Sequence, residues 1–309
     1  MKTVDAALGK WPSILSMIGI SPEFLTGKHT ACPACQAGKD RFRFANTEGR
    51  GEFFCSTCGH GDGFDLIQKI MNWDFRKTAQ EVEKLVGVAK KVDIKPQETT
   101  DQKRRRLNNL SKRVKPLNQS KSVMDYLRSR GISDDTLSQA NLSVIRGYEY
   151  YEGGSIGGRY DVLVGKVMQC GRPITYHLTY TDKGIKADVR AARKVLPPVV
   201  KFTHGAIELF KHEGKLGVAE GIETALSTYQ QFQTPTWSCL NSNSLQNFVI
   251  PEGVNHLLIF ADNDQNRVGQ KAAETLKSKA DYQGVKCDIL TPSQIGQDWN
   301  DVLVASNGA

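Results

Sequence analysis

Short apolar runs alternate with amphipathic segments in the last third of the chain. The runs cover residues 216–219, 236–240, 256–261 and 286–290. Such short runs are typical of strands buried on both faces of a parallel sheet. Apolar residues recur with the helical period over residues 223–232, 268–280 and 299–304. This order of elements predicts an α/β unit with a central parallel sheet over residues 213–309.

The middle of the chain mixes both periodicities. Apolar residues at helical spacing begin at Ser122, and a second helix is expected to begin at Ser133, which suits an N-cap position. Strand patterns follow at residues 161–168 and 173–180, and a turn is expected at 182–184. We therefore assign residues 122–212 to the α+β N-terminal part of a larger folded core.

The first 88 residues predict a small β-rich domain with flanking helices. Basic and aromatic residues alternate over 41–44, and a Gly-rich turn at 49–51 precedes a second strand pattern. Period-two alternation places Arg41 and Arg43 on one face of a strand and Phe42 and Phe44 on the other. From residue 64 to residue 86 the apolar residues follow the helical period.

Charge is distributed unevenly along the chain. The formal net charge is +8, and residues 90–121 hold eleven Lys or Arg against three Asp or Glu. The rest of the chain therefore has equal numbers of both signs. We interpret residues 89–121 as a basic, flexible linker, which could be a solvated spacer or could hold a polyanion through counterion release.

Four of the seven cysteines form two closely spaced pairs, Cys32 with Cys35 and Cys55 with Cys58. Two C-x₂-C turns can close one tetrahedral Zn²⁺ site, and nineteen residues between the pairs fit the spacing of zinc ribbons. Four thiolates leave no open position, so the site is expected to be structural. His60 is expected in a loop or facing nucleic acid. The isolated cysteines are expected to be packed; they are Cys170, Cys239 and Cys287.

Acidic residues follow two of the predicted parallel strands. Glu220 ends the first run, and Asp262 and Asp264 end the run at 256–261. Because the carboxyl ends of neighbouring parallel strands meet in one crevice, these side chains are expected to cluster. Clustered carboxylates need a counter-ion, and Mg²⁺ or Mn²⁺ is the usual one. A single Asp-x-Asp pair could merely cap a strand, but two acidic strand ends together favour a metal site.

These residues resemble the Toprim domain of primases and topoisomerases, which has a strand-terminal Glu-Gly and a strand-terminal Asp-x-Asp. Here the motifs are Glu220-Gly221 and Asp262-Asn263-Asp264, and residues 269–273 match the helix that follows. Residues 297–301 resemble the third acidic element of bacterial primases and make Asp298 the next metal ligand. A four-Cys ribbon, a linker and a Toprim domain stand in this order in bacterial replicative primases and their phage and plasmid relatives. The amino-acid sequence of residues 220–226 is most similar to that of primases from the phage and mobile-element branch.

Two positions depart from the bacterial pattern. Thr224 stands where an Asp four residues after the Glu is usual, with Glu223 on another side of the turn, and Asn300 replaces the second Asp of the third element, with Asp301 one place later. The resemblance therefore implies the cation held by Glu220, Asp262 and Asp264 more firmly than any further one.

The resemblance implies a DNA primase that joins ribonucleoside triphosphates on single-stranded DNA. Asp262 and Asp264 would bind the catalytic cation, and Glu220 would be a further ligand or the general base. Basic residues are expected to grip triphosphates or template phosphates; they are Lys186, Arg190, Arg193, Lys194, Lys201 and Lys271. In the ribbon, residues expected to contact DNA are Lys39, Arg41 and Arg43.

Other functions fit parts of the pattern. A Toprim nuclease would degrade DNA without nucleotides, a topoisomerase would need a nucleophilic Tyr and a strand-gating region, and a zinc-ribbon DNA-binding protein would have no activity. Every Gly-Lys pair lacks the hydroxyl residue of a phosphate loop, so any helicase is expected as a separate partner. No run approaches the roughly 18 apolar residues of a membrane helix, and the mildly apolar N-terminus lacks signal-peptide features. The expected location is the bacterial cytoplasm.

Overall fold

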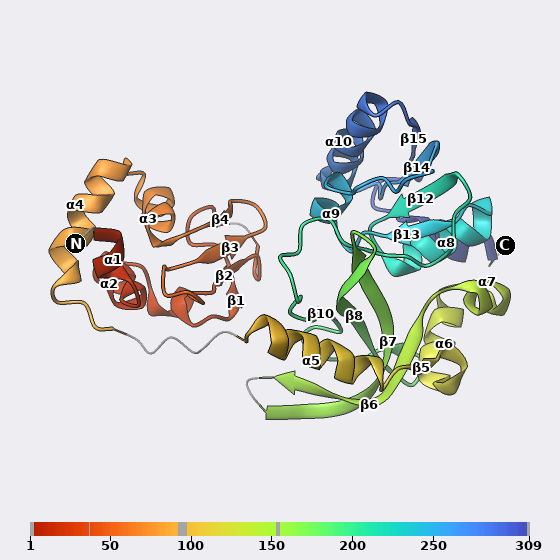
Figure 1. Cartoon of the computed structure of the whole chain (residues 1–309), viewed down its shortest axis with the longest axis horizontal. Coiled ribbons are helices and arrows are strands. Elements are labelled where there is room, and N and C mark those ends of the chain that lie inside the picture. Colours follow the sequence, from red (N-terminus) through yellow and green to blue (C-terminus); the bar gives the residue numbers. More distant parts are fainter. Residues whose placement is uncertain (1–2, 37, 92–97, 153–154, 308–309) are drawn as a thin grey trace. The chain divides into compact units, whose positions relative to one another are not determined.

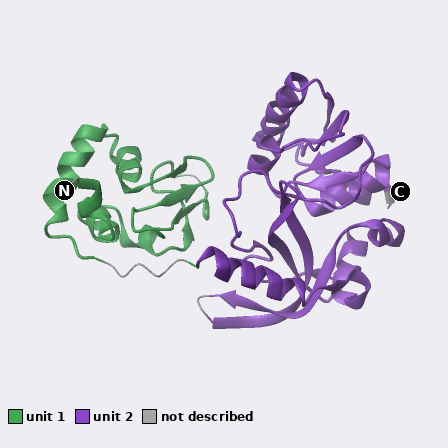
Figure 2. Ribbon diagram, in the orientation of Figure 1, with its two compact units in different colours: residues 1–98 green, residues 99–309 purple. Residues whose placement is uncertain are grey.

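The computed structural model describes residues 3–36, 38–91, 98–152 and 155–307. The chain forms two compact units, Met1–Glu98 and Thr99–Ala309 (Figure 2). Each unit buries its own apolar core. Among the described residues, no helix is both long and apolar enough to cross a membrane.

Unit 1 contains a small antiparallel sheet in the order β1-β2-β3-β4 (Figure 1). The strands are β1 (His29–Thr30), β2 (Phe42–Phe44), β3 (Phe53–Cys55) and β4 (Gly59–Gly61). Alternation in β2 and β3 buries Phe42, Phe44 and Phe53 and exposes Arg43 and Phe54. The predicted hairpin and the facing of its side chains are therefore confirmed.

Helices pack around this sheet and complete the core of unit 1. They are α1 (Thr3–Ala7), α2 (Trp11–Met17), the short 3₁₀ helix η1 (Pro22–Leu25), α3 (Gly63–Met71) and α4 (Phe75–Val86). The helical pattern over 64–86 forms two helices because Asn72 adopts a left-handed backbone (φ 52°) and Asp74 caps α4 by accepting from the Lys77 amide at 2.7 Å. A Cβ at Gly63 would lie 2.1 Å from the Trp11 ring, so only glycine fits this contact.

The segment 89–121 differs from the predicted flexible linker. Thr100–Ser111 form α5, which begins with a capping box between Thr99 and Gln102. Leu110 is buried and Leu107 packs against the same cluster of unit 2. These two leucines dock the helix on unit 2, although its other positions are charged or polar. Two apolar residues are too few to give a recognisable helical period in the sequence. Residues 92–97 of the predicted linker lie outside the described residues.

The first half of unit 2 is an antiparallel layer with helices at its side. Its long strands are β6 (Ser143–Glu152), β7 (Ser155–Gln169) and β8 (Arg172–Asp182). Shorter elements are β5 (Lys115–Pro116), η2 (Leu117–Gln119), α6 (Lys121–Ser129), α7 (Asp134–Gln139), β9 (Ile185–Lys186), β10 (Arg193–Val195) and β11 (Ala206–Ile207). β6 was not predicted, since its half-exposed alternation resembles a polar loop.

The second half of unit 2 is the predicted α/β unit. Its strands are β12 (Lys215–Ala219), β13 (Thr236–Ser238), β14 (His256–Phe260) and β15 (Lys286–Leu290), and they pair in parallel in the order β13-β12-β14-β15. Its helices are α8 (Ile222–Phe232), α9 (Ser242–Gln246), α10 (Val268–Tyr282) and α11 (Trp299–Asn307).

Both faces of the parallel strands are covered. In β14, Leu257 and Ile259 pack with residues of α10, whereas Leu258 and Phe260 pack with residues of α8 and α11. Successive side chains of a strand point to opposite faces, so a run without polar residues must be buried on both sides. Antiparallel β11 joins this part to β7, and eleven described strands form one mixed sheet. The proposed boundary between residues 212 and 213 lies between β11 and β12 and remains a prediction.

The predicted fold class is confirmed. The chain has a small antiparallel sheet that bears the cysteines, followed by a larger α+β core that contains an α/β part with parallel strands.

Candidate zinc and acidic sites

Four thiols converge in unit 1. The Sγ atoms of Cys32, Cys35, Cys55 and Cys58 all lie within 4.8 Å of one another, with Cys32 3.7 Å from Cys58 and Cys35 3.9 Å from Cys55. A tetrahedron with Zn–S bonds of about 2.3 Å has sulfur atoms about 3.8 Å apart. The thiols therefore have the spacing of a zinc site, with Cys32 and Cys55 buried.

Backbone amides support these sulfur atoms. The amides of Thr57 and Cys58 each donate to Cys55 Sγ at 3.4 Å, and the Cys32 thiol receives amides from its own turn. Burial and the neighbouring thiols raise the pKa of Cys58. Four thiolates so close together need a cation to remain ionised, which Zn²⁺ supplies.

In unit 2, two acidic turns meet at the carboxyl edge of the parallel strands. Ala219 of β12 lies opposite Phe260 of β14, so Glu220 and Asp262 follow the ends of neighbouring strands, and the charge of Glu220 acts on Asp262. The Ser242 amide donates to the Glu220 carboxylate, and Ser238 Oγ donates to the Glu220 carbonyl at 2.9 Å. A Cβ at Gly269 would lie 3.0 Å from Glu220 Oε1, so this glycine lets the start of α10 approach the acid.

Asn263 holds the second and third acidic elements together. Its amide donates to the Gln297 carbonyl at 3.0 Å, its carbonyl accepts from the Gly296 amide at 2.7 Å, and its Nδ2 donates to the Pro292 carbonyl at 2.8 Å. These bonds fix the turn 262–264 against the loop that carries Asp298. In the sequence Asn263 is only the spacer of Asp-x-Asp, because these three partners are more than 25 residues away.

Two half-buried acids, Glu220 and Asp262, have strongly raised pKa values. Burial and the charge of Asp264 raise the pKa of Glu220 to about 7. Burial and the charges of Glu220, Asp298 and Asp264 raise the pKa of Asp262 to about 7. Asp264 is exposed, and Asp262 Oδ1 is buried without a hydrogen-bond partner.

The donor set fits Mg²⁺ or Mn²⁺. Within the described part of the chain, only the four cysteines bring ligand atoms of three or more His, Cys, Asp or Glu within 4.8 Å of one another. The acids form a looser group, which suits Mg²⁺ because that ion keeps several water ligands and uses one or two carboxylates. The unpartnered Asp262 Oδ1 is the atom that a cation would satisfy first.

The third acidic element has a structural role as well. Asp298 Oδ1 accepts from the Asp301 amide at 2.8 Å, and Asp301 Oδ2 accepts from the Asp298 amide at 3.2 Å, so the two acids cap α11. Asn300 is buried and donates to the Arg130 carbonyl at 2.7 Å and to Ser227 Oγ at 2.8 Å. Asn300 therefore ties α11 into the core.

The basic residues predicted to bind nucleotides have different surroundings. Lys186 pairs with Glu223 at 3.2 Å, whereas Lys194 Nζ lies 3.5 Å from the centre of the Tyr150 ring and donates to the Tyr151 carbonyl. The remaining ones are exposed: Arg190, Arg193, Lys201 and Lys271. In the ribbon, Arg41 donates to Thr57 Oγ1 at 3.2 Å, Arg43 donates to the Gly27 carbonyl at 3.2 Å, and Lys39 is exposed. Their contacts with nucleic acid remain predictions.

Strand pairing in the ribbon aligns four exposed side chains that the sequence alone does not bring together. The cross-strand register places His29 opposite Arg43, Arg43 opposite Phe54, and Phe54 opposite His60. All four side chains are exposed, and 52% of Phe54 is accessible. We call this set the ribbon row. The alternation around Phe54 was available in the sequence, but the pairing that aligns the four residues was not.

We expect loss of zinc to unfold unit 1. Replacing Cys55 and Cys58 together by serine should abolish zinc binding, because two thiolates cannot close the tetrahedron. Zinc content and protease resistance of unit 1 measure the effect. Cys170→Ser is the matched control, because Cys170 is exposed and not packed as predicted, whereas Cys239 and Cys287 are buried. Full zinc retention in the double variant would contradict the assignment.

The acidic site should also make unit 2 less stable as the pH rises. The ordinary pKa values of Glu220 and Asp262 are 4.5 and 3.8, and both rise to about 7 on folding. The folded state therefore binds more protons between these values, and its stability falls from about pH 5 to about pH 7 without divalent cations. Denaturant unfolding of unit 2 at several pH values should show this slope, and Mg²⁺ should reduce it.

The variant carrying Glu220→Gln and Asp262→Asn should be less sensitive to pH over the same range. An unchanged slope in this variant would show that other groups cause the dependence.

Comparison with known proteins gives separate matches for three parts of the chain. Residues 215–308 match the Toprim domain family, residues 27–64 match the zinc-binding domain of primase-helicase, and residues 101–207 match a domain of unknown function (DUF7146). The last match includes α5, which agrees with its place in unit 2.

The solved structures that resemble the chain include several primases. The zinc-binding and RNA polymerase domains of the Aquifex aeolicus primase are 17% identical, with 99% of this chain and 85% of that chain covered and a TM-score of 0.46. A DNA primase domain from Pseudomonas aeruginosa is 16% identical, covering 65% and 74%, with a TM-score of 0.45. A DnaG primase catalytic domain bound to ssDNA is 14% identical, covering 66% and 77%, with a TM-score of 0.47. Two segments of the chain are therefore similar to the zinc-binding domain of primase-helicase and to the Toprim domain.

Proposed function

We propose that the protein is a DNA primase that synthesises RNA primers on single-stranded DNA by metal-dependent nucleotidyl transfer. The observation that carries this proposal is that one chain combines a segment similar to a primase-type zinc-binding domain with a segment similar to a Toprim domain, whose half-buried strand-end acids have raised pKa values. A Toprim domain alone fits several DNA enzymes, and the zinc-binding domain narrows the choice.

In this proposal Asp262 and Asp264 hold the catalytic cation, with Asp298 near enough to add its charge. The cation would neutralise charge on the phosphate oxygens and activate the attacking 3′-hydroxyl. Glu220 either ligates the cation or accepts the hydroxyl proton, and a pKa of about 7 suits proton transfer near neutral pH. Its burial between the Ser242 amide and Gly269 keeps the carboxylate in one orientation.

The ribbon row supports a role in holding the template. Bases of single-stranded DNA stack on exposed aromatic rings, while cationic side chains hold the phosphates. Phe54 offers the ring and Arg43 beside it offers the charge, with an imidazole at each end of the row. Lys39 and Arg41 lie next to the same hairpin. Single-stranded DNA and ribonucleoside triphosphates are therefore the proposed partners, with a replicative helicase supplied by a separate chain.

The proposed setting is replication of a phage, plasmid or other mobile element in the bacterial cytoplasm. The motif Glu220-Gly221-Ile222-Glu223-Thr224-Ala225-Leu226 supports it, because its wording resembles that branch of primases.

Replacement of Asp262 by Asn should reduce primer synthesis by at least about a hundredfold, since one cation ligand and its charge are lost. The assay contains single-stranded DNA of varied sequence, labelled nucleotides and Mg²⁺ or Mn²⁺, with products resolved by length. Asp281→Asn, an exposed acid of α10, is the matched control. Zinc content and DNA binding should persist in both variants.

Two results would contradict the proposed function. Primer synthesis that survives in the Asp262→Asn variant would remove the acids from the mechanism. DNA degradation by the unaltered protein in the absence of nucleotides, without primer products in their presence, would indicate a Toprim nuclease.

Phe54→Ala should weaken binding of single-stranded DNA about fivefold or more, because stacking of one base contributes roughly 1–3 kcal/mol. Fluorescence anisotropy with a labelled oligonucleotide measures the change. Phe75→Ala is the matched control, since Phe75 is an equally exposed aromatic residue of unit 1 on α4, outside the ribbon row. Equal losses in both variants would argue against the ribbon row as the binding surface.

A further inference from the structure

A cavity of about 980 Å³ lies at the amino-terminal edge of the parallel strands in unit 2. It is lined by residues 208–212 between β11 and β12, by the ends of α7 and α8, and by the start of β13. Glu220 follows the last residue of β12, whereas Lys211 and His212 precede its first residue. The cavity and the acidic turn are therefore at opposite ends of a five-residue strand, which is about 16 Å long.

Aromatic side chains form one wall of this cavity. The rings of Phe210 and Tyr229 stack with their centres 3.8 Å apart, and the rings of His212 and Trp237 meet edge-on at 5.5 Å. Trp237 Nε1 donates to the Phe210 carbonyl at 2.7 Å, and the Tyr229 hydroxyl donates to Gln139 Oε1 at 2.6 Å. The indole and the phenol therefore form their hydrogen bonds within the fold, while their rings line the cavity.

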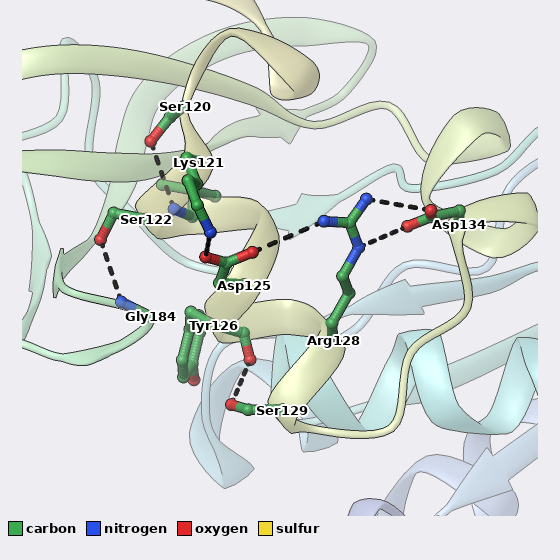
Figure 3. A network of polar contacts seen from close by, with 10 residues as sticks. Ser120, Lys121, Ser122, Asp125, Tyr126, Arg128, Ser129, Asp134 and Gly184 are labelled. Carbon is green, nitrogen blue, oxygen red and sulfur yellow. Dashed lines mark hydrogen bonds and ion pairs between the residues drawn. The ribbon is translucent and has the colours of Figure 1, made fainter.

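The helices behind this wall are anchored to one another (Figure 3). Arg128 of α6 donates to both carboxylate oxygens of Asp134, the first residue of α7, at 2.8 and 2.9 Å. The Tyr126 hydroxyl of α6 donates to the buried Glu223 carboxylate of α8. Because α6 is bonded to both α7 and α8, the ends of these two helices that line the cavity are held in defined positions.

The loop on the other side of the cavity is also fixed. The Asn141 amide donates to the Leu209 carbonyl at 2.8 Å, and Asn141 Nδ2 donates to the Glu208 carbonyl at 3.2 Å. These bonds hold the backbone that carries the Glu208 side chain. Ligand sites are usually preformed clefts of about 300–1,000 Å³ in which aromatic walls surround a few polar groups, and this cavity has that size and composition.

Three polar groups of the same loop line the cavity and await a partner. Among the described residues, the Glu208 carboxylate and the Lys211 ammonium form no hydrogen bond or ion pair, and His212 Nδ1 is buried without a hydrogen bond. Burial raises the pKa of the Glu208 carboxyl, although the charges of His212 and Lys166 oppose the shift. Polar groups removed from water without a bond are costly, so a ligand that donates to the carboxylate and bonds the imidazole would stabilise the cavity.

We propose that this cavity binds a nucleobase that carries an amino group, as adenine, guanine and cytosine do, with Lys211 pairing with the attached phosphate. A flat base fits an aromatic wall because bases stack on aromatic rings. A carboxylate accepts hydrogen bonds from the amino group of a base, and uracil and thymine lack that group. A free nucleotide and a nucleic-acid strand both supply such a base. The site is separate from the acidic turn and needs no cation.

The test is binding of nucleoside monophosphates to the zinc-loaded full-length protein, measured by titration calorimetry without Mg²⁺ or Mn²⁺. At least one of AMP, GMP and CMP should bind about tenfold more tightly than UMP, because a hydrogen bond to a charged group is lost with uracil. Glu208→Gln should weaken that binding about tenfold, since the charge of the acceptor is removed. Lys211→Met, at an exposed position, should weaken it about threefold and keeps the proposal testable if Glu208→Gln does not fold.

Two variants serve as controls. Glu213→Gln makes the same change of charge at an exposed residue just beyond the lining loop and should leave binding unchanged. Asp262→Asn should bind the monophosphates as the unaltered protein does, which separates this site from the acidic site of the proposed function.

A second measurement identifies the source of the base. Binding of a labelled single-stranded oligonucleotide is followed by fluorescence anisotropy in the unaltered protein and in Glu208→Gln. If the base belongs to a strand, Glu208→Gln weakens oligonucleotide binding about tenfold. If it belongs to a free nucleotide, only monophosphate binding falls. Both results support the cavity as a nucleobase site.

Two results would overturn the proposal. One is UMP binding as tight as that of the other three monophosphates. The other is unaltered binding of every monophosphate and of the oligonucleotide in folded Glu208→Gln and Lys211→Met, including the case in which no monophosphate binds.

Discussion

Glu220 and Asp262 are half-buried where two neighbouring parallel strands end, and much of unit 2 holds them there. Burial raises both pKa values to about 7, helped by the charge of Asp264 at Glu220 and by the charges of Glu220, Asp298 and Asp264 at Asp262. The site can relieve this cost by taking up a proton or a cation. The Ser242 amide, Gly269 at the start of α10 and the bonds of Asn263 keep the acids in place. The ionised acids lower the stability of the folded state, but they are already in place to bind a cation.

Two glutamates beside this site have opposite electrostatic surroundings. Glu223 stands three residues after Glu220, yet its charge is matched by Lys186 and Arg193 and its pKa is lowered. Asn300 occupies a position where bacterial primases carry an acid, and here it bonds to Arg130 and Ser227 inside the core. Glu223 and Asn300 therefore add no free carboxylate to the site, because one is in an ion pair and the other is hydrogen-bonded inside the core.

Several features could be predicted from the sequence because they depend on local spacing. The cysteine pairs, the alternation in β2 and the unbroken apolar runs of β12 and β14 each limit the backbone to one arrangement. β6, α5 and the ribbon row were missed for a common reason. Each of these features depends on contacts with other segments of the chain. β6 is a half-exposed strand that needs β7 beside it, α5 docks through Leu107 and Leu110, and the ribbon row is aligned only by the pairing of its strands.

By itself, the sequence determined the order of the elements, the zinc ligands and the strand ends that bear Glu220 and Asp262, since these follow from residue spacing within single segments. Only the tertiary structure decided which charges meet. Lys186 is separated from Glu223 by 37 positions and Tyr126 by 97, and no periodicity records such pairs. Electrostatic partners depend on distance in space and on burial, and both arise when the two halves of unit 2 fold into one sheet.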